Sequence, residues 1–115
     1  MGIFSNFFGS NKSFDLDVNT FSEKIKNDKN AVILDVRTKE EFLDLRIPNS
    51  ELIDIYKPDF LSNIEKLDRS KNYYIYCRSG NRSGTAVRQM VKLGFENVYH
   101  LKHGIISWKG KVERG

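Results

Sequence analysis

The sequence contains a single cysteine and two histidines in 115 residues. One cysteine cannot form an internal disulfide, which fits a reducing compartment, and we expect a cytoplasmic protein. Two histidines and one cysteine at scattered spacing are not a zinc-binding pattern, so we expect no metal ion. A run of about 18 apolar residues, the length that spans a membrane, is absent, and no transmembrane segment is expected.

Other features that would indicate a function class are also absent. The sequence has no glycine-rich nucleotide motif, no internal repeat and no basic surface interleaved with aromatic residues. We therefore expect no cofactor and no nucleic-acid partner. The net charge of +4 is a mild excess, which indicates a solvated surface with a weak preference for anionic partners. The length fits one compact domain, and the sequence carries no signal for an oligomeric state.

The two ends of the chain differ from its middle in composition. Residues 1–14 have an apolar tip without the basic region, long apolar region and cleavage site of an export signal. Its side chains Ile3, Phe4, Phe7 and Phe8 are spaced to form one face of a helical turn that docks on the domain, a partner or a membrane surface. A frayed terminus is the alternative. We expect one domain at residues 15–109 and a solvated basic tail at residues 110–115.

Short β-branched or aromatic runs alternate with helically spaced stretches, which is typical of an α/β protein with a mainly parallel sheet. Continuous runs predict buried strands at Ala31 to Leu34, Tyr73 to Tyr76 and Val98 to Leu101. Weaker patterns predict strands at Asp15 to Val18 and Leu52 to Ile55. Four helices are predicted: one that begins at a Thr20–Glu23 capping box, one over Lys39 to Leu45, one that begins at Pro58, and one from the Cys77 loop to Gly94. We expect Ile105, Ile106 and Trp108 to close the fold on a short helix, with Trp108 as a packing residue.

The only cysteine follows a predicted strand and precedes a predicted helix. The carboxyl ends of parallel strands are where ligands bind in open α/β sheets. The residues after Cys77 allow a tight curve in which successive N–H groups point at one centre beside the helix's positive end: Ser79, Gly80, Asn81, Ser83 and Gly84. This loop is therefore expected to bind an anion.

Two arginines in this loop, Arg78 and Arg82, supply permanent positive charge. They are expected to lower the pKa of the Cys77 thiol and to hold an anionic substrate. Cys77 would then be a thiolate nucleophile at neutral pH. The alternative is that Cys77 is a small buried apolar residue, which needs neither the glycines nor the arginines.

Cys77-Arg78-Ser79-Gly80-Asn81-Arg82-Ser83 resembles the active-site loop of rhodanese-like domains, which are sulfurtransferases that carry sulfur as a cysteine persulfide. The resemblance covers about residues 15–109 and includes Leu34-Asp35-Val36-Arg37, Glu40-Glu41-Phe42, Ile47-Pro48, Gly94-Phe95-Glu96-Asn97-Val98, Leu101, Gly104-Ile105 and Trp108.

The resemblance implies a mainly parallel sheet of about five strands with helices on both faces. It implies Cys77 as the catalytic residue and residues 78–83 as the substrate-binding loop, with thiosulfate or a persulfide as the anionic donor and a thiol or protein as the acceptor. Asp35 and Arg37 would support the active-site side structurally, with Asp35 accepting backbone N–H bonds. Glu41 would pair weakly with a neighbouring arginine.

The chain departs from the family pattern at two places. Leu45-Arg46 stands where many members have Gly-His, and Asn49 stands where they have Gly after Ile47-Pro48. We expect the turn to be kept, because Asn49 tolerates the left-handed region. His103-Gly104 replaces a frequent Gly-Gly, and His103 is left out of the catalytic set because an activated thiolate needs no base.

Two other functions stay open on the sequence. Cysteine-dependent phosphatases and arsenate reductases resemble Cys-x5-Arg, whereas Ser83 occupies that position here. A persulfide carrier or protein-binding module would use the same loop to dock a partner, with the apolar N-terminal tip as a handle.

Overall fold

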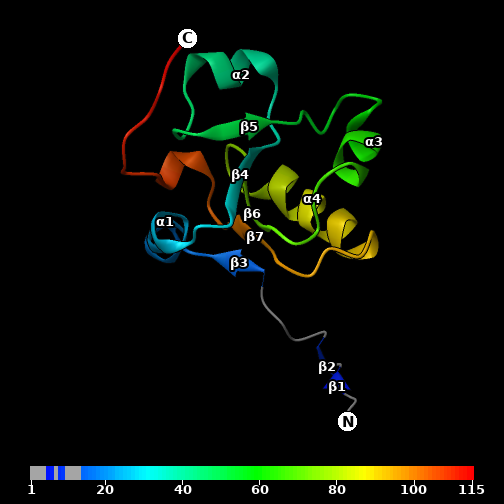
Figure 1. Cartoon of the computed structure of the whole chain (residues 1–115). Coiled ribbons are helices and arrows are strands. Elements are labelled where there is room, and N and C mark those ends of the chain that lie inside the picture. Colours follow the sequence, from blue (N-terminus) through cyan, green and yellow to red (C-terminus); the bar gives the residue numbers. More distant parts are fainter. Residues whose placement is uncertain (1–4, 7, 10–13) are drawn as a thin grey trace.

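The protein is a parallel five-stranded sheet with helices on both faces, seen in a computed structural model that describes residues 5–6, 8–9 and 14–115 (Figure 1). The strand order is β3-β7-β6-β4-β5, and every neighbouring pair is parallel. The strands are β3 (Asp15–Leu16), β4 (Ala31–Asp35), β5 (Ser50–Leu52), β6 (Asn72–Tyr76) and β7 (Val98–Leu101). This arrangement confirms the expected fold.

Helices connect successive strands of the sheet, and a short 3-10 turn follows the last strand. They are α1 (Val18–Asn27), α2 (Lys39–Asp44), α3 (Phe60–Glu65), α4 (Asn81–Lys92) and the 3-10 turn η1 (Ile105–Ser107). Figure 1 shows α1 and the orange η1 turn on one side of the sheet and α3 and α4 on the other, with α2 beside the edge strand β5. Among the described residues, no helix is long and apolar enough to cross a membrane.

Alternation along β6 sends side chains into two separate cores, because successive residues of a strand face opposite sides of the sheet. Tyr73, Ile75 and Cys77 pack on the α3 and α4 side. Tyr74 and Tyr76 pack on the α1 and η1 side. Both faces of β6 are therefore dry, and Cys77 follows the most deeply covered strand of the sheet.

The N-terminal part of the predicted pattern needs correction. Val18 begins α1 instead of ending a strand, and the helix is capped by Asp17, whose carboxylate accepts the Thr20 amide at 2.8 Å. The Thr20–Glu23 capping box is wrong, because Asp17 is also a favoured cap residue and lies at the end of β3. A full capping box forms instead between Thr38 and Glu41 at the start of α2.

The predicted edge strand and terminal turn also differ in detail. The strand β5 covers Ser50–Leu52 and stops before Ile53. Of the apolar residues around η1, Ile105 is buried and Trp108 packs edge-on against Phe21, as expected, but Ile106 is 64% exposed. Phe42 is only partly covered, and α2 contributes no buried residue.

The two ends of the chain have some order in the structure. Ser5–Asn6 (β1) and Phe8–Gly9 (β2) form a two-stranded pair. Of the helical face expected at Ile3, Phe4, Phe7 and Phe8, the first three residues lie outside the described part of the chain, and Phe8 lies in the strand β2 instead of a helical turn. The exposed C-terminal tail returns toward α2, where Glu113 and Arg46 exchange backbone hydrogen bonds of 2.8 and 2.9 Å.

Candidate functional site

Cys77 lies directly after β6, where the chain leaves the sheet and turns into α4. Its carbonyl accepts a 2.9 Å hydrogen bond from the Ile105 amide, which ties the strand end to η1. Gly80 then takes a left-handed conformation, with φ of 108°, and caps α4. The first turn of the helix is thereby folded back over the Cys77 side chain.

The sulfur of Cys77 lies inside a cradle of neutral hydrogen-bonding groups. The amides of Gly80 and Ser83 point at Sγ from 3.1 and 3.4 Å, and the Ser83 hydroxyl lies 3.5 Å away. Burial raises the pKa of the Cys77 thiol, but the Ser83 hydroxyl and the amides of Ser83, Gly80 and Ser79 more than offset this, so the pKa lies below its ordinary value. The direction is the expected one, but the main causes are these donors and not the two arginines.

Two glycines allow the loop to lie against the β7–η1 connection. A side chain on Gly80 would collide with the Lys102 carbonyl, and one on Gly104 would collide with the Arg78 carbonyl. Both glycines also have positive φ. Gly104 is therefore the required glycine of the His103-Gly104 pair, and His103 itself is exposed.

Arg82 points toward α2 and forms a forked ion pair with Glu41, with N–O distances of 2.8 and 3.0 Å. The Arg82 guanidinium and, to a lesser extent, the α2 capping box lower the pKa of Glu41 to about 2. Arg82 also lies 5.6 Å from the centre of the exposed Tyr56 ring. The pairing expected for Glu41 exists, and it is better buried than an ordinary surface pair.

The remaining predicted loop residues lie on the outside of the curve. The side chains of Arg78, Ser79 and Asn81 are exposed. Ser79 and Gly80 contribute backbone amides, and only Ser83 brings a side-chain group to the sulfur. The structure thus surrounds the sulfur with neutral donors, while Arg78 is exposed and Arg82 is paired with Glu41.

Asp35 and Arg37 form a buried pair at the end of β4. Asp35 accepts the Arg37 amide at 2.9 Å and both arms of its guanidinium at 2.7 to 3.1 Å. Arg37 also donates to the Leu45 carbonyl at 2.6 Å, which anchors the end of α2. The turn beyond it is kept, with Asn49 at φ of 68°. These contacts fit the structural role expected for the pair.

Two residues near the sulfur were not included in the expected site. His100 Nδ1 lies 2.8 Å from Ser83 Oγ, and His100 Nε2 lies 2.6 Å from an Asp15 carboxylate oxygen. The sequence could have indicated the position of His100, because alternation along β7 places it on the same face as Val98, which packs beneath α4. The contact with Asp15 depends on the β3–β7 register and leaves no local signal.

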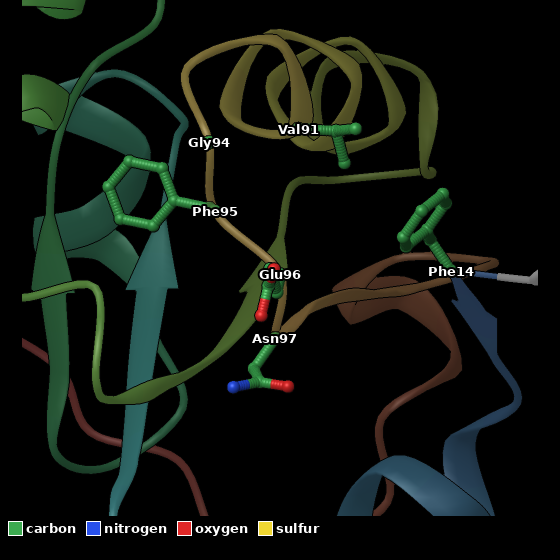
Figure 2. A pocket seen from close by; sticks show the side chains of 6 residues that line it. All are labelled: Phe14, Val91, Gly94, Phe95, Glu96 and Asn97. Atoms are coloured by element: carbon green, nitrogen blue, oxygen red, sulfur yellow. The ribbon is translucent and has the colours of Figure 1, made fainter. Parts of the chain in front are cut away.

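A hollow of about 520 Å³ lies at the other end of α4. Figure 2 shows Val91 on the helix, with Phe14 and the loop from Gly94 to Asn97 beneath it. Since α4 has 12 residues, this hollow is roughly 18 Å along the helix from the Cys77 loop. In the described part of the chain, no group of three or more His, Cys, Asp or Glu side chains gathers as metal ligands would.

The fold and this loop define a class of parallel α/β domains that present a thiol at a strand–helix junction. The family model described as "Rhodanese-like domain" matches residues 17–111. The chain therefore belongs to the rhodanese-like domain family.

Several similar proteins carry names from sulfur metabolism. The Bacillus subtilis protein YrkF, provisionally named as a sulfur carrier, is 34% identical over 86% of this chain, which spans 52% of YrkF. Bacillus subtilis YtwF, provisionally named as a sulfurtransferase, is 33% identical over 79% of this chain and 85% of its own length. An Allochromatium vinosum sulfurtransferase is 30% identical over 82% of this chain and 86% of its own.

Solved structures agree with this assignment. A rhodanese-related protein from Thermoplasma volcanium is 31% identical with a TM-score of 0.76, and the match covers 86% of this chain and 96% of that protein. A rhodanese-like domain protein from Staphylococcus aureus has the same TM-score at 26% identity, over 88% and 97% of the two chains.

Proposed function

We propose that this protein transfers sulfane sulfur through a persulfide on Cys77, from thiosulfate or a persulfide donor to a thiophilic acceptor. The observation that carries the proposal is the cradle, in which two amides and a hydroxyl converge on one buried sulfur. These donors stabilise an anion on that sulfur without a permanent partner charge. A thiolate has its negative charge on this sulfur, and a persulfide anion has it on the sulfur bonded to this one.

The proposed reaction has two displacement steps at sulfur. The Cys77 thiolate attacks the outer sulfur of thiosulfate, the S–S bond of thiosulfate breaks, and sulfite leaves with the bonding electron pair. The persulfide anion remains on Cys77. A thiophilic acceptor, such as cyanide or a thiolate, then takes the terminal sulfur, and the Cys77 thiolate is restored with its charge.

The two loop arginines have different proposed roles. Arg82 is oriented by Glu41, so its guanidinium presents a fixed charge beside the loop. It binds the anionic sulfur donor through the N–H groups that Glu41 does not use. Arg78 is exposed and attracts the anion from solution. The backbone amides of Ser79, Gly80 and Ser83 lie close to the reacting sulfur, and they hold the anion that forms there.

The proposal is tested by the mass of the intact protein before and after incubation with thiosulfate, followed by cyanide. We expect a gain of one sulfur atom that cyanide removes and that Cys77→Ala abolishes. Cys77→Ala should keep the fold, because alanine fills most of the buried cysteine's space, and its thermal melting curve is the control. Turnover by the folded variant, or no sulfur gain by the native chain from thiosulfate or a persulfide donor, would contradict the proposal.

A persulfide carrier that docks a protein partner is the second candidate, favoured by the name given to YrkF. It would gain sulfur from a protein persulfide but turn over free thiosulfate slowly, so the choice of donor in the same mass experiment separates the two. A phosphatase is disfavoured, because the Cys-x5-Arg position holds Ser83, which is fully buried against the sulfur. An aryl phosphate assay is therefore expected to show no hydrolysis.

A further inference from the structure

A continuous line of hydrogen-bonding groups connects the Cys77 sulfur to the surface. It runs from Cys77 Sγ to Ser83 Oγ at 3.5 Å, from Ser83 Oγ to His100 Nδ1 at 2.8 Å, and from His100 Nε2 to an Asp15 carboxylate oxygen at 2.6 Å. Ser83 is fully buried, His100 is 6% exposed, and the Asp15 side chain is 51% exposed. Three strands and the first turn of α4 therefore bring four residues into one line.

The hydrogen-bonding capacity of each atom determines which group along this line donates and which accepts. His100 Nε2 faces a carboxylate, so this nitrogen carries a hydrogen and Nδ1 of the neutral ring is an acceptor. The Ser83 hydroxyl, which has one hydrogen, then donates to Nδ1, and its oxygen accepts the Cys77 S–H. The Gly80 carbonyl, 3.2 Å from Ser83 Oγ, is the competing acceptor.

We propose that His100 and Asp15 are positioning residues that activate Cys77 through Ser83, by taking the thiol proton along this line. The thiol hydrogen moves to Ser83 Oγ as the Ser83 hydrogen moves to His100 Nδ1. Two hydrogens shift, no bond between heavy atoms changes, and the charges created are one thiolate and one imidazolium. The Ser83 hydroxyl then donates to the thiolate, and the Asp15 carboxylate faces the positive ring.

The ring is packed so that it keeps this orientation. His100 lies against Gly84 of α4, where an added Cβ would be 3.5 Å from the ring carbon Cε1. The charged or titratable groups around the ring come from three elements. Asp15 from β3 contacts Nε2, Arg88 from α4 lies beside the ring at Gly84, and Cys77 at the end of β6 is linked to the ring through Ser83.

This inference concerns the thiol itself and needs no sulfur donor, so it goes beyond the proposed transfer reaction. The test is the rate of Cys77 alkylation by iodoacetamide as a function of pH. Because Cys77 is the only cysteine, all alkylation reports on it. His100→Asn keeps a polar atom near Ser83 but cannot take the proton. His103→Asn is the matched control, since His103 is the other histidine and is exposed.

We expect His100→Asn to lower the alkylation rate at neutral pH about tenfold, which corresponds to a displacement of the profile by about one pH unit. The rate should return to the native plateau at high pH, where the thiol ionises without help. Asp15→Asn should lower the neutral rate about threefold, because its carboxylate is half exposed. His103→Asn should follow the native profile.

A purely structural role for His100 would change the melting curve or the plateau and leave the midpoint of the profile in place. That result in His100→Asn would overturn the proposal. If His100→Asn does not fold, the exposed Asp15→Asn variant decides, and a native profile in that variant would equally overturn the proposal. Failure of thiosulfate to load sulfur onto Cys77 would contradict the proposed function and leave this test unaffected.

Discussion

The two sides of the Cys77 loop are held by different kinds of interaction. On the α4 side, neutral donors from Gly80 and Ser83 meet a buried sulfur. On the α2 side, the forked pair of Glu41 and Arg82 has side chains that are 28% and 20% exposed. Hydrogen bonds in a dry site act strongly over short range, whereas a partly wet ion pair is weakened by water and salt.

This difference separates two tasks that the sequence combines in one loop. The neutral side sets the state of the thiol, because its donors touch the sulfur. In the proposed reaction, the charged side attracts and holds the anionic sulfur donor, because Arg82 lies beside the loop. Variants on the two sides should therefore change different measurements. Those on the α4 side should change the rate of thiol alkylation, and those on the α2 side should change the KM for the sulfur donor.

The largest effect is expected when the Cys77 loop can no longer pack against the β7–η1 connection. Gly104→Ala places a Cβ against the Arg78 carbonyl and also strains a positive φ. We expect a loss of about 3 kcal/mol or more in the free energy of unfolding, measured by chemical denaturation. Gly94→Ala is the matched control, because Gly94 has φ of 94° but its nearest neighbouring atom is 3.9 Å from an added Cβ. It should lose only about 1 kcal/mol. Equal losses would show that the close approach to Arg78 contributes nothing.

The next effect is expected on the neutral side, from Ser83→Ala. Removing the hydroxyl takes away the side-chain donor to the sulfur, so the pKa of Cys77 should rise. Alkylation at neutral pH should fall about tenfold or more and recover at high pH. Thr85→Ala removes a hydroxyl from the same turn of α4 that donates to the Asn81 carbonyl and accepts from Arg88 Nη2, and it should leave the profile unchanged. A native profile in Ser83→Ala would assign the low thiol pKa to the amides alone.

Arg82→Ala tests the charged side directly. We expect the KM for thiosulfate to rise about tenfold and kcat to fall, because the cation attracts the donor and also stabilises the charge of the departing sulfite. Alkylation by neutral iodoacetamide should change by less than about twofold, since the donors on the sulfur are kept. A displaced alkylation profile would show that the thiol responds to Arg82 as much as to its neutral cradle.

The centre of the sheet was predictable from sequence, whereas its edges were not. Strands β4 and β6 are covered on both faces, so their continuous apolar runs match their bounds closely. The edge strand β3 stops at Leu16, and β5 stops at Leu52. At such edges the pairing partner decides the length, and no local pattern of apolar residues records it.

The candidate site divides in the same way. The curve from Cys77 to Ser83 is local, so glycine positions and residue types were sufficient to predict it. The partners that orient it are distant in sequence: Glu41 is 41 residues from Arg82, and Asp15 is 85 residues from His100. The Asp15–His100 contact depends on the β3–β7 register, and the Glu41–Arg82 contact depends on the helices that follow the neighbouring strands β4 and β6, so both require the folded topology.

The smallest effect is expected on stability in acid, from Glu41→Gln. The pKa of Glu41 is lowered from 4.5 to about 2 in the folded chain. A carboxyl group whose pKa is lowered by folding stabilises the folded state at pH values above its pKa in the unfolded chain. This contribution is lost as the pH falls from about 4.5 through about 2. Allowing for solvent screening, the native chain should exceed Glu41→Gln by about 1 kcal/mol at neutral pH.

The difference between the two chains should shrink as the pH is lowered through that window, and urea denaturation at several pH values measures it. Glu40→Gln is the matched control, because Glu40 is an exposed carboxylate in the same turn of α2. Glutamine can still accept the Thr38 bonds of the capping box, so the comparison isolates the charge facing Arg82. A stability difference that stays constant down to low pH would place the effect of Glu41 in helix capping, and the two sides of the loop would then both depend on neutral hydrogen bonds.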